Sequence, residues 1–228
     1  MIVAIAGQPP DTVAAALAAN LAVLRRRAGA HVLLVDAGRR QADRAWLAAR
    51  AAARLSPRPQ VLAMSGYGFG ERLDQTLGHY DDVLIDVGDC AGHECRSALI
   101  AAQVALVPIA PRDADPARAY DLIARLNAAR MFNPGLRVLF AAVADAQDGD
   151  VQEGDARAAL AAVRAYAAEV MSGHVAAAVL ARGALLETAQ PGRCACDSAG
   201  CAIAQQLDAL NVEIFGAAHA RHLTWAHA

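Results

Sequence analysis

The sequence predicts an α/β fold: a three-layer α/β/α sandwich around a mostly parallel sheet. Short apolar runs alternate with longer segments of helical periodicity along the 228 residues. The short runs are apolar throughout rather than at every second residue, which is typical of parallel strands covered on both faces. The length suits one domain with a full core. We therefore expect a single domain over residues 1–216, followed by a C-terminal tail over residues 217–228.

Seven strands and seven helices are expected, and they alternate along the chain. The apolar runs place strands at 1–6, 31–36, 59–63, 82–87, 103–109, 136–143 and 174–180. The helical patterns fall at 12–28, 41–54, 70–79, 93–102, 114–131, 152–171 and 199–215. Gly29, Gly135 and Gly173 stand where a helix must give way to a strand, as helix-stop chemistry favours. The acidic segment 145–155 is interpreted as a solvated loop, because its carboxylates do not follow the ligand pattern of a calcium loop.

Composition narrows the classes of protein that this chain can belong to. Hydrophobic residues make up 56% and aromatic residues only 4%, so the core must be built from Ala, Val and Leu. The net charge of −2 argues against a broad electrostatic grip on nucleic acid. No apolar stretch approaches the ~18–20 residues of a membrane span, and the chain lacks a signal-peptide pattern. With its five cysteines interpreted as free thiols, we expect a cytoplasmic protein.

The segment after the first predicted strand lacks the groups that bind phosphate. A phosphate-binding loop needs glycines, a lysine and a Ser/Thr hydroxyl, yet all 21 basic residues of this chain are arginines. Two prolines here remove backbone N–H donors, and an aspartate occupies the helix end that would attract phosphate. Ala14 and Ala15 supply neither an ammonium nor a hydroxyl. We therefore predict a vestigial loop, which consists of Gly7, Gln8, Pro9, Pro10, Asp11 and Thr12.

Residues 1–112 resemble the ParA/MinD family, the deviant-Walker ATPases of the P-loop NTPase class. The family opens with a strand, then Lys-Gly-Gly-x-Gly-Lys-Ser/Thr-Thr, then a helix that ends in Asn-Leu-Ala. Asn20, Leu21 and Ala22 match that ending. An alignment without gaps puts Pro9 in the signature-lysine position, and it puts Ala14 and Ala15 in the positions of the P-loop lysine and Ser/Thr. The resemblance implies the family's fold with a degenerate Walker A motif.

The resemblance also assigns two aspartates at predicted strand ends. His31–Asp36 is similar to the family's second strand, whose last Asp orients the attacking water. Tyr80–Asp86 is similar to the Walker B strand, whose last Asp holds magnesium through water. Such carboxylates face the crevice where parallel sheets bind ligands. We name no catalytic residue: Asp36 and Asp86 are either remains of a lost site or hydrogen-bonding scaffold, or they retain the binding of some other anion or of a nucleotide.

Two cysteine clusters are candidate metal sites. The first consists of Cys194, Cys196 and Cys201, and the second of Cys90, His93 and Cys95. Thiolates at C-x-C spacing can share a soft metal such as zinc, and the second cluster offers the missing ligand. Neither spacing is the paired C-x-x-C signature. Buried packing thiols and a redox role therefore stay open as alternatives.

The first of three functional hypotheses is a pseudo-ATPase that does not hydrolyse ATP and needs no cofactor. It would act as an interaction or regulatory partner of itself or of an active bacterial homologue, in partitioning, polar localisation or secretion. It would form a homodimer, if any, without nucleotide. The second is a plasmid-partition ATPase that binds ATP and magnesium at an unorthodox site, with Arg182, Arg193 and Arg221 as weak candidates for DNA contact. The third is a metal- or redox-responsive dimer that uses the cysteines.

Overall fold

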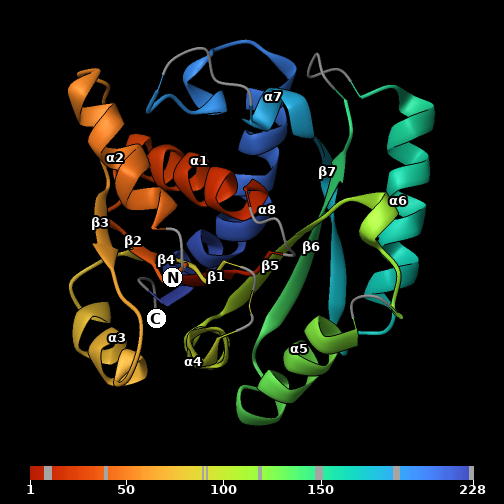
Figure 1. Cartoon of the computed structure of the whole chain (residues 1–228), viewed down its shortest axis with the longest axis horizontal. Coiled ribbons are helices and arrows are strands. Elements are labelled where there is room, and N and C mark those ends of the chain that lie inside the picture. Colours follow the sequence, from red (N-terminus) through yellow and green to blue (C-terminus); the bar gives the residue numbers. More distant parts are fainter. Residues whose placement is uncertain are drawn as a thin grey trace.

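The structure is a computed structural model that describes residues 1–7, 12–38, 41–88, 90, 92–117, 120–146, 151–186 and 191–225, with side chains to residue 216. A seven-stranded sheet forms its middle layer, in the order β3-β2-β4-β1-β5-β6-β7 (Figure 1). Every strand pair in the sheet is parallel. The predicted three-layer α/β/α class is thereby confirmed.

The strands lie within two residues of their predicted limits. They are β1 (Ile2–Ile5), β2 (Val32–Asp36), β3 (Gln60–Ala63), β4 (Asp82–Asp86), β5 (Val104–Ile109), β6 (Arg137–Ala144) and β7 (Gly173–Ala181). Every residue of the central strands β2, β4 and β5 is buried. Continuous apolar runs are required there, because helices cover both faces of the sheet.

Two helical layers cover the sheet. One face carries α1 (Val13–Arg27), α2 (Ala42–Ala52), α7 (Arg182–Leu186), the 3₁₀ turn η2 (Ala195–Asp197) and α8 (Ala202–Trp225). The other carries α3 (Phe69–Leu77), α4 (His93–Ala101), α5 (Tyr120–Phe132) and α6 (Glu153–Ala167). A second 3₁₀ turn, η1 (Pro111–Asp113), follows β5. The cores are small-residue cores, as composition predicted.

Three helical features differ most from the sequence-based expectation. The helix expected from residue 114 begins at Tyr120, because Asp115 precedes a proline, which disfavours helical backbone, and its carboxylate accepts a hydrogen bond from the Ala117 N–H. The backbone of α8 runs on to Trp225, past the end expected at 215, since alanines follow Gly216 and favour helix. The short helices α7, η1 and η2 were not expected, because they are too short for a periodic pattern.

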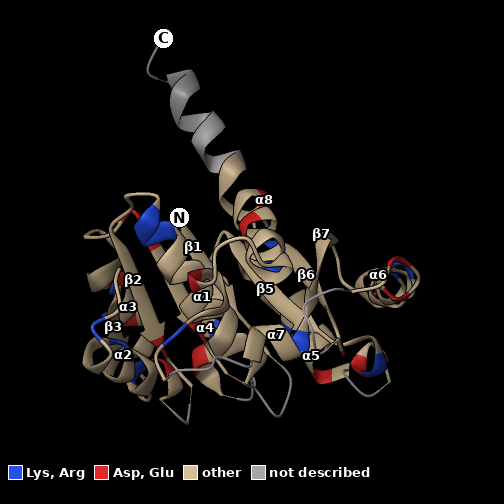
Figure 2. Ribbon diagram, turned by 90° about the horizontal axis from the view of Figure 1, so that it is seen from above, with Lys and Arg blue, Asp and Glu red and all other residues tan. Residues whose placement is uncertain are grey.

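The described surface carries charges of both signs, and they are interspersed, as along α6 (Figure 2). No helix among the described residues is long and apolar enough to cross a membrane. Neither observation distinguishes the functional hypotheses, so the distinction must come from the sites.

Candidate functional site

Asp36 and Asp86 lie side by side at the carboxyl edge of the sheet. They are register partners on the neighbouring strands β2 and β4, and Ile5 of β1 pairs with Asp86 on its other side. The backbone N–H of Gly7 donates to the Gly88 carbonyl over 2.9 Å, so the segment after β1 begins against the segment after β4. The fold thus brings the two predicted carboxylates and the start of the predicted loop to one place.

Backbone N–H groups hold the Asp36 carboxylate. The Arg44 N–H donates to its Oδ2 over 3.2 Å, and the N–H groups of Gly38 and Asp43 also bond to this side chain. Burial raises the pKa of Asp36 above its ordinary value of 3.8, although these hydrogen bonds act in the opposite direction. The carboxylate therefore fixes the turn between β2 and α2.

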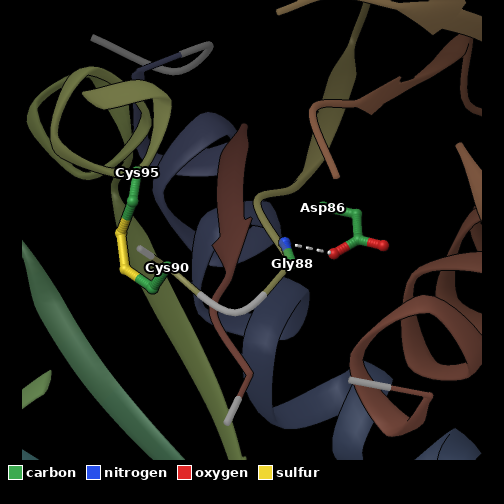
Figure 3. Close-up of a disulfide and its surroundings, with 4 residues drawn as sticks. All are labelled: Asp86, Gly88, Cys90 and Cys95. Carbon is green, nitrogen blue, oxygen red and sulfur yellow. Dashed lines mark hydrogen bonds between the residues drawn. A yellow bond between two sulfur atoms is a disulfide. The ribbon is translucent and has the colours of Figure 1, made fainter. Parts of the chain in front are cut away.

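The Asp86 carboxylate bonds to its own turn. Its Oδ1 accepts the Gly88 N–H over 2.9 Å, and the chain then runs on to Cys90 (Figure 3). A side chain added at Gly38 would lie 3.6 Å from Asp36 Oδ1 and 4.0 Å from Gly88 Cα. The turns after β2 and β4 therefore pack closely at this edge.

The predicted loop is described only at its two ends. Gly7 closes β1, and Thr12 is the exposed N-cap of α1 with no side-chain hydrogen bond to the helix. Gln8, Pro9, Pro10 and Asp11 lie outside the described residues. Ala14 is fully buried in the core between α1 and the sheet, in the first turn of the helix. The residue that the sequence resemblance assigns to the P-loop lysine position is therefore packed in the core.

The expectation that all five cysteines are free thiols is wrong for two of them. Cys90 and Cys95 form a disulfide between the β4–α4 turn and the first turn of α4 (Figure 3). The turn brings the two Cα atoms to 5.0 Å, within the range that a disulfide spans. His93 stands apart, with an exposed ring whose Nε2 lies 3.1 Å from the Gly66 carbonyl oxygen. The second cluster is therefore not a set of three free ligands.

The first cluster keeps two of its thiols together. Cys194 and Cys196 are buried in and beside η2, and the Cys194 thiol donates a hydrogen bond to the Cys196 sulfur. This bond lowers the pKa of Cys196 and raises that of Cys194. Cys201 is half-buried and donates to the Ser198 carbonyl over 2.9 Å.

The two clusters do not combine into one site. Cys90 and Cys95 belong to the core on the α3–α6 face of the sheet, whereas Cys194 and Cys196 belong to the core on the α1–α8 face. Among the described residues, no group of three or more His, Cys, Asp or Glu side chains is placed to hold a metal ion. The structure therefore does not assemble the shared site for which the cysteine spacings were considered.

Sequence reasoning missed a buried ion pair on the α1–α8 face. Arg50 of α2 is fully buried, and its guanidinium bonds both carboxylate oxygens of Asp197, over 2.7 and 3.1 Å. Its other N–H groups bond the carbonyl oxygens of Ser56, Pro57 and Gly192, so all five donors of the guanidinium are used. We call Arg50 and Asp197 the buried ion pair. An arginine within an Ala-rich helix was the only visible signal, and it says nothing about depth.

The motif residue Asn20 has a structural task on the same face. Its side-chain oxygen accepts the Cys196 N–H over 2.9 Å, and its amide nitrogen donates to the Ala16 carbonyl over 2.7 Å. Arg27 adds a 2.5 Å bond to Asp197. We call residues 191–198, which include η2, the C-terminal turn. The Asn-Leu-Ala match of the sequence therefore marks a contact between α1 and this turn.

Comparison with known proteins agrees on the fold. No protein-family model and no curated protein matches the sequence. Among solved structures, MinD in the MinC:MinD cell division complex of Aquifex aeolicus matches with a TM-score of 0.65 and 12% identity, over 94% of this chain and 96% of that one. Apo McdA from Cyanthece matches with a TM-score of 0.63 and 14% identity, over 92% and 97%. The septum site-determining protein MinD of Pyrococcus horikoshii, solved with Mg-ADP, matches with 0.60 and 18%, over 93% and 95%. The chain thus has the ParA/MinD fold over nearly its whole length, and the predicted resemblance is confirmed at the level of the fold.

Proposed function

We propose that this chain is a ParA/MinD-like protein that does not hydrolyse ATP and acts through protein contacts. One observation carries the proposal: alanines stand in the positions of the P-loop lysine and Ser/Thr, and no lysine exists elsewhere in the chain to replace them. P-loop ATPases accelerate phosphoryl transfer by positioning the phosphates and stabilising their charge. Without the lysine ammonium and the Ser/Thr hydroxyl that binds magnesium, that stabilisation is lost.

The residues of this edge do not fit Mg-ATP. Ala14 is packed in the core, and Ala15 is half-buried with only a methyl group to offer. The Asp36 carboxylate is bonded by three backbone N–H groups, and Asp86 bonds Gly88. These contacts support a scaffold role for both aspartates. We therefore derive no catalytic step at this edge, and we propose no resident nucleotide.

The partner in this proposal is a second copy of the chain or an active homologue. A similar structure is of MinD in complex with MinC, which supports a role in a protein assembly. Pairing would be independent of nucleotide, because no phosphate would bridge the two copies. We propose partitioning, polar localisation or secretion as the process, in the cytoplasm. Genomic neighbours of the coding sequence would distinguish these processes.

The decisive experiment is a calorimetric titration with Mg-ATP, accompanied by a phosphate-release assay. We expect no binding tighter than about 1 mM, equivalent to about −4 kcal/mol. The rate of phosphate release should not exceed that of a blank without protein. Micromolar binding, together with turnover that Asp36→Ala abolishes, would favour the alternative of a partition-type ATPase with an unorthodox nucleotide site.

Two loop variants tell which missing groups matter. Replacing Pro9, Pro10 and Asp11 by Gly restores backbone N–H donors but no ammonium or hydroxyl, so we expect it to leave binding absent. The matched variant adds Ala14→Lys and Ala15→Thr to the same glycines. Binding by the glycine variant alone would contradict the assignment of the defect to Ala14 and Ala15. Circular dichroism of both variants checks that they fold.

A further inference from the structure

The Cys90–Cys95 disulfide closes a turn that also carries contacts of the carboxyl edge. Both cysteines are buried in the core of the α3–α6 face, at 2% and 1% exposure. Cys90 has φ = 52°, in the left-handed region that residues other than glycine adopt only when the surroundings hold them there. The bond to Cys95 is one such restraint, because Cys95 is fixed in the first turn of α4.

Two residues before Cys90, the same turn bonds both halves of the carboxyl edge. The Gly88 N–H donates to Asp86 Oδ1 and the Gly88 carbonyl accepts from the Gly7 N–H, each over 2.9 Å. Gly88 itself has φ = 64°. A restraint at Cys90 therefore also limits the position of Gly88 and its contact with Asp86 (Figure 3). The contact of Gly88 with Gly7 is limited in the same way.

We propose that Cys90–Cys95 is a reversible thiol–disulfide exchange site for dithiols, and that its redox state controls how firmly Gly88 holds Asp86 and Gly7. The site does not depend on the loss of ATP hydrolysis, but its reversible role rests on the cytoplasmic location given in the proposed function. The other three cysteines are free thiols, so the molecule holds oxidised and reduced sulfur at once. Disulfides that form in cytosolic proteins are usually transient or redox-sensing, which fits a reversible role.

The exchange is a two-electron step with thiols on both sides. A thiolate of the dithiol attacks one sulfur of the disulfide, the S–S bond breaks, and the released cysteine thiolate takes up a proton. The second thiol of the reductant then loses its proton and attacks the mixed disulfide. The products are a cyclic disulfide of the reductant and two cysteine thiols. A low-molecular-weight disulfide drives the reverse step.

Burial of both sulfurs makes the exchange depend on opening of the turn. The attacking thiolate must reach a sulfur that water scarcely touches, so the turn has to leave the core first. Any contact that holds Gly88 in place should slow that opening. Coupling between two equilibria is reciprocal, so loosening Asp86 should favour opening of the turn, and reduction should loosen Gly88. Because opening precedes attack on the sulfur, more frequent opening should also speed reduction.

The test counts thiols and follows the amide of Gly88. Denaturation and alkylation without reductant should label three cysteines, and after reduction five. Hydrogen exchange at Gly88 should be at least about tenfold faster in the reduced protein, because the opening that exposes the amide becomes more frequent. Asp86→Asn should shorten the half-time of reduction by dithiothreitol. The control Asp208→Asn, an exposed carboxylate on α8, should leave that half-time unchanged.

Each measurement has an outcome that overturns the proposal. If five cysteines are still labelled after treatment of the native protein with oxidised glutathione, no disulfide forms, and the proposed exchange site is contradicted. Equal exchange at Gly88 in the oxidised and reduced protein would remove the coupling. The wild-type chain in its two redox states carries this test, so a misfolded Cys90→Ser variant would not spoil it.

Discussion

The carboxyl edge of β2 and β4 and the buried ion pair hold acidic side chains in opposite ways. At the edge, Asp36 is buried and forms no ion pair with the described residues, and its carboxylate accepts hydrogen bonds from backbone N–H groups of one turn. At the ion pair, Asp197 meets a guanidinium whose five donors are all used, and Arg27 adds a second cation. Burial therefore raises the pKa of Asp36, whereas the hydrogen bonds and charge of Arg50 outweigh burial and lower the pKa of Asp197.

The difference separates a region that resembles a nucleotide site from a region that holds distant elements of the fold together. The edge that resembles a nucleotide site retains carboxylates without the cationic groups of the family's loop. In the C-terminal turn, by contrast, the Asp197 carboxylate is paired with Arg50 and Arg27, and these contacts tie α1 and α2 to the region after β7. Substitutions at the C-terminal turn should therefore lower the free energy of unfolding far more than substitutions at the carboxyl edge.

The largest effect is expected from Arg50→Met. It leaves Asp197 with only the half-exposed Arg27 as counter-charge and removes the donors to three carbonyl groups. Removing one partner of a buried ion pair lowers the free energy of unfolding by about 3–5 kcal/mol. Because Arg27 still pairs with Asp197 in the variant, we expect a loss at the lower end, about 3 kcal/mol. Urea denaturation measures it. Arg157→Met, which breaks an exposed pair with Glu153 on α6, is the control and should cost less than about 0.5 kcal/mol. Equal costs for the two variants would contradict the contrast.

Gly192→Ala should have the next largest effect. A Cβ at this position would lie 2.2 Å from the backbone nitrogen of Arg50 and 2.4 Å from its Cα, and Gly192 has φ = 79°. Backbone strain and overpacking together should cost about 2–4 kcal/mol. Gly29→Ala is the matched control, because its φ is 89° but nothing lies within 4 Å of the added atom. We expect it to cost only the strain, about 1 kcal/mol. A Gly192→Ala protein as stable as Gly29→Ala would mean that the C-terminal turn does not press on α2.

The smallest effect is a pair of opposite pH dependences. The pKa of Asp197 is lowered in the folded state, so its contribution to stability is present above pH 3.8 and is lost as the pH falls through the folded pKa. The pKa of Asp36 is raised, so the folded state binds its proton more tightly and its contribution falls as the pH rises from 3.8 through the folded pKa. The cost of Asp197→Asn should therefore grow with pH, and that of Asp36→Asn should shrink. Denaturation of both variants between pH 3 and 7 tests this, and slopes of the same sign would refute it.

The sequence alone determined the layers, the order of the elements along the chain and the absence of lysine. Short continuous apolar runs that alternate with helical patterns are typical of strands covered on both faces, so β2, β4 and β5 were predicted nearly to the residue. The absence of lysine is a property of composition, and no folding can supply a lysine ammonium. Asp36 and Asp86 were placed at one edge for the same reason, because parallel strands end together.

Only the tertiary structure decided which distant residues meet. Cys90 and Cys194 look equivalent in the sequence, yet the sheet separates them into different cores, and a turn joins Cys90 to Cys95. Arg50 looks like one more surface arginine, yet it is fully buried, because Asp197 arrives from 147 residues away to compensate its charge. Local pattern reports periodicity and composition, whereas burial of a charge depends on a partner that the sequence does not place next to it.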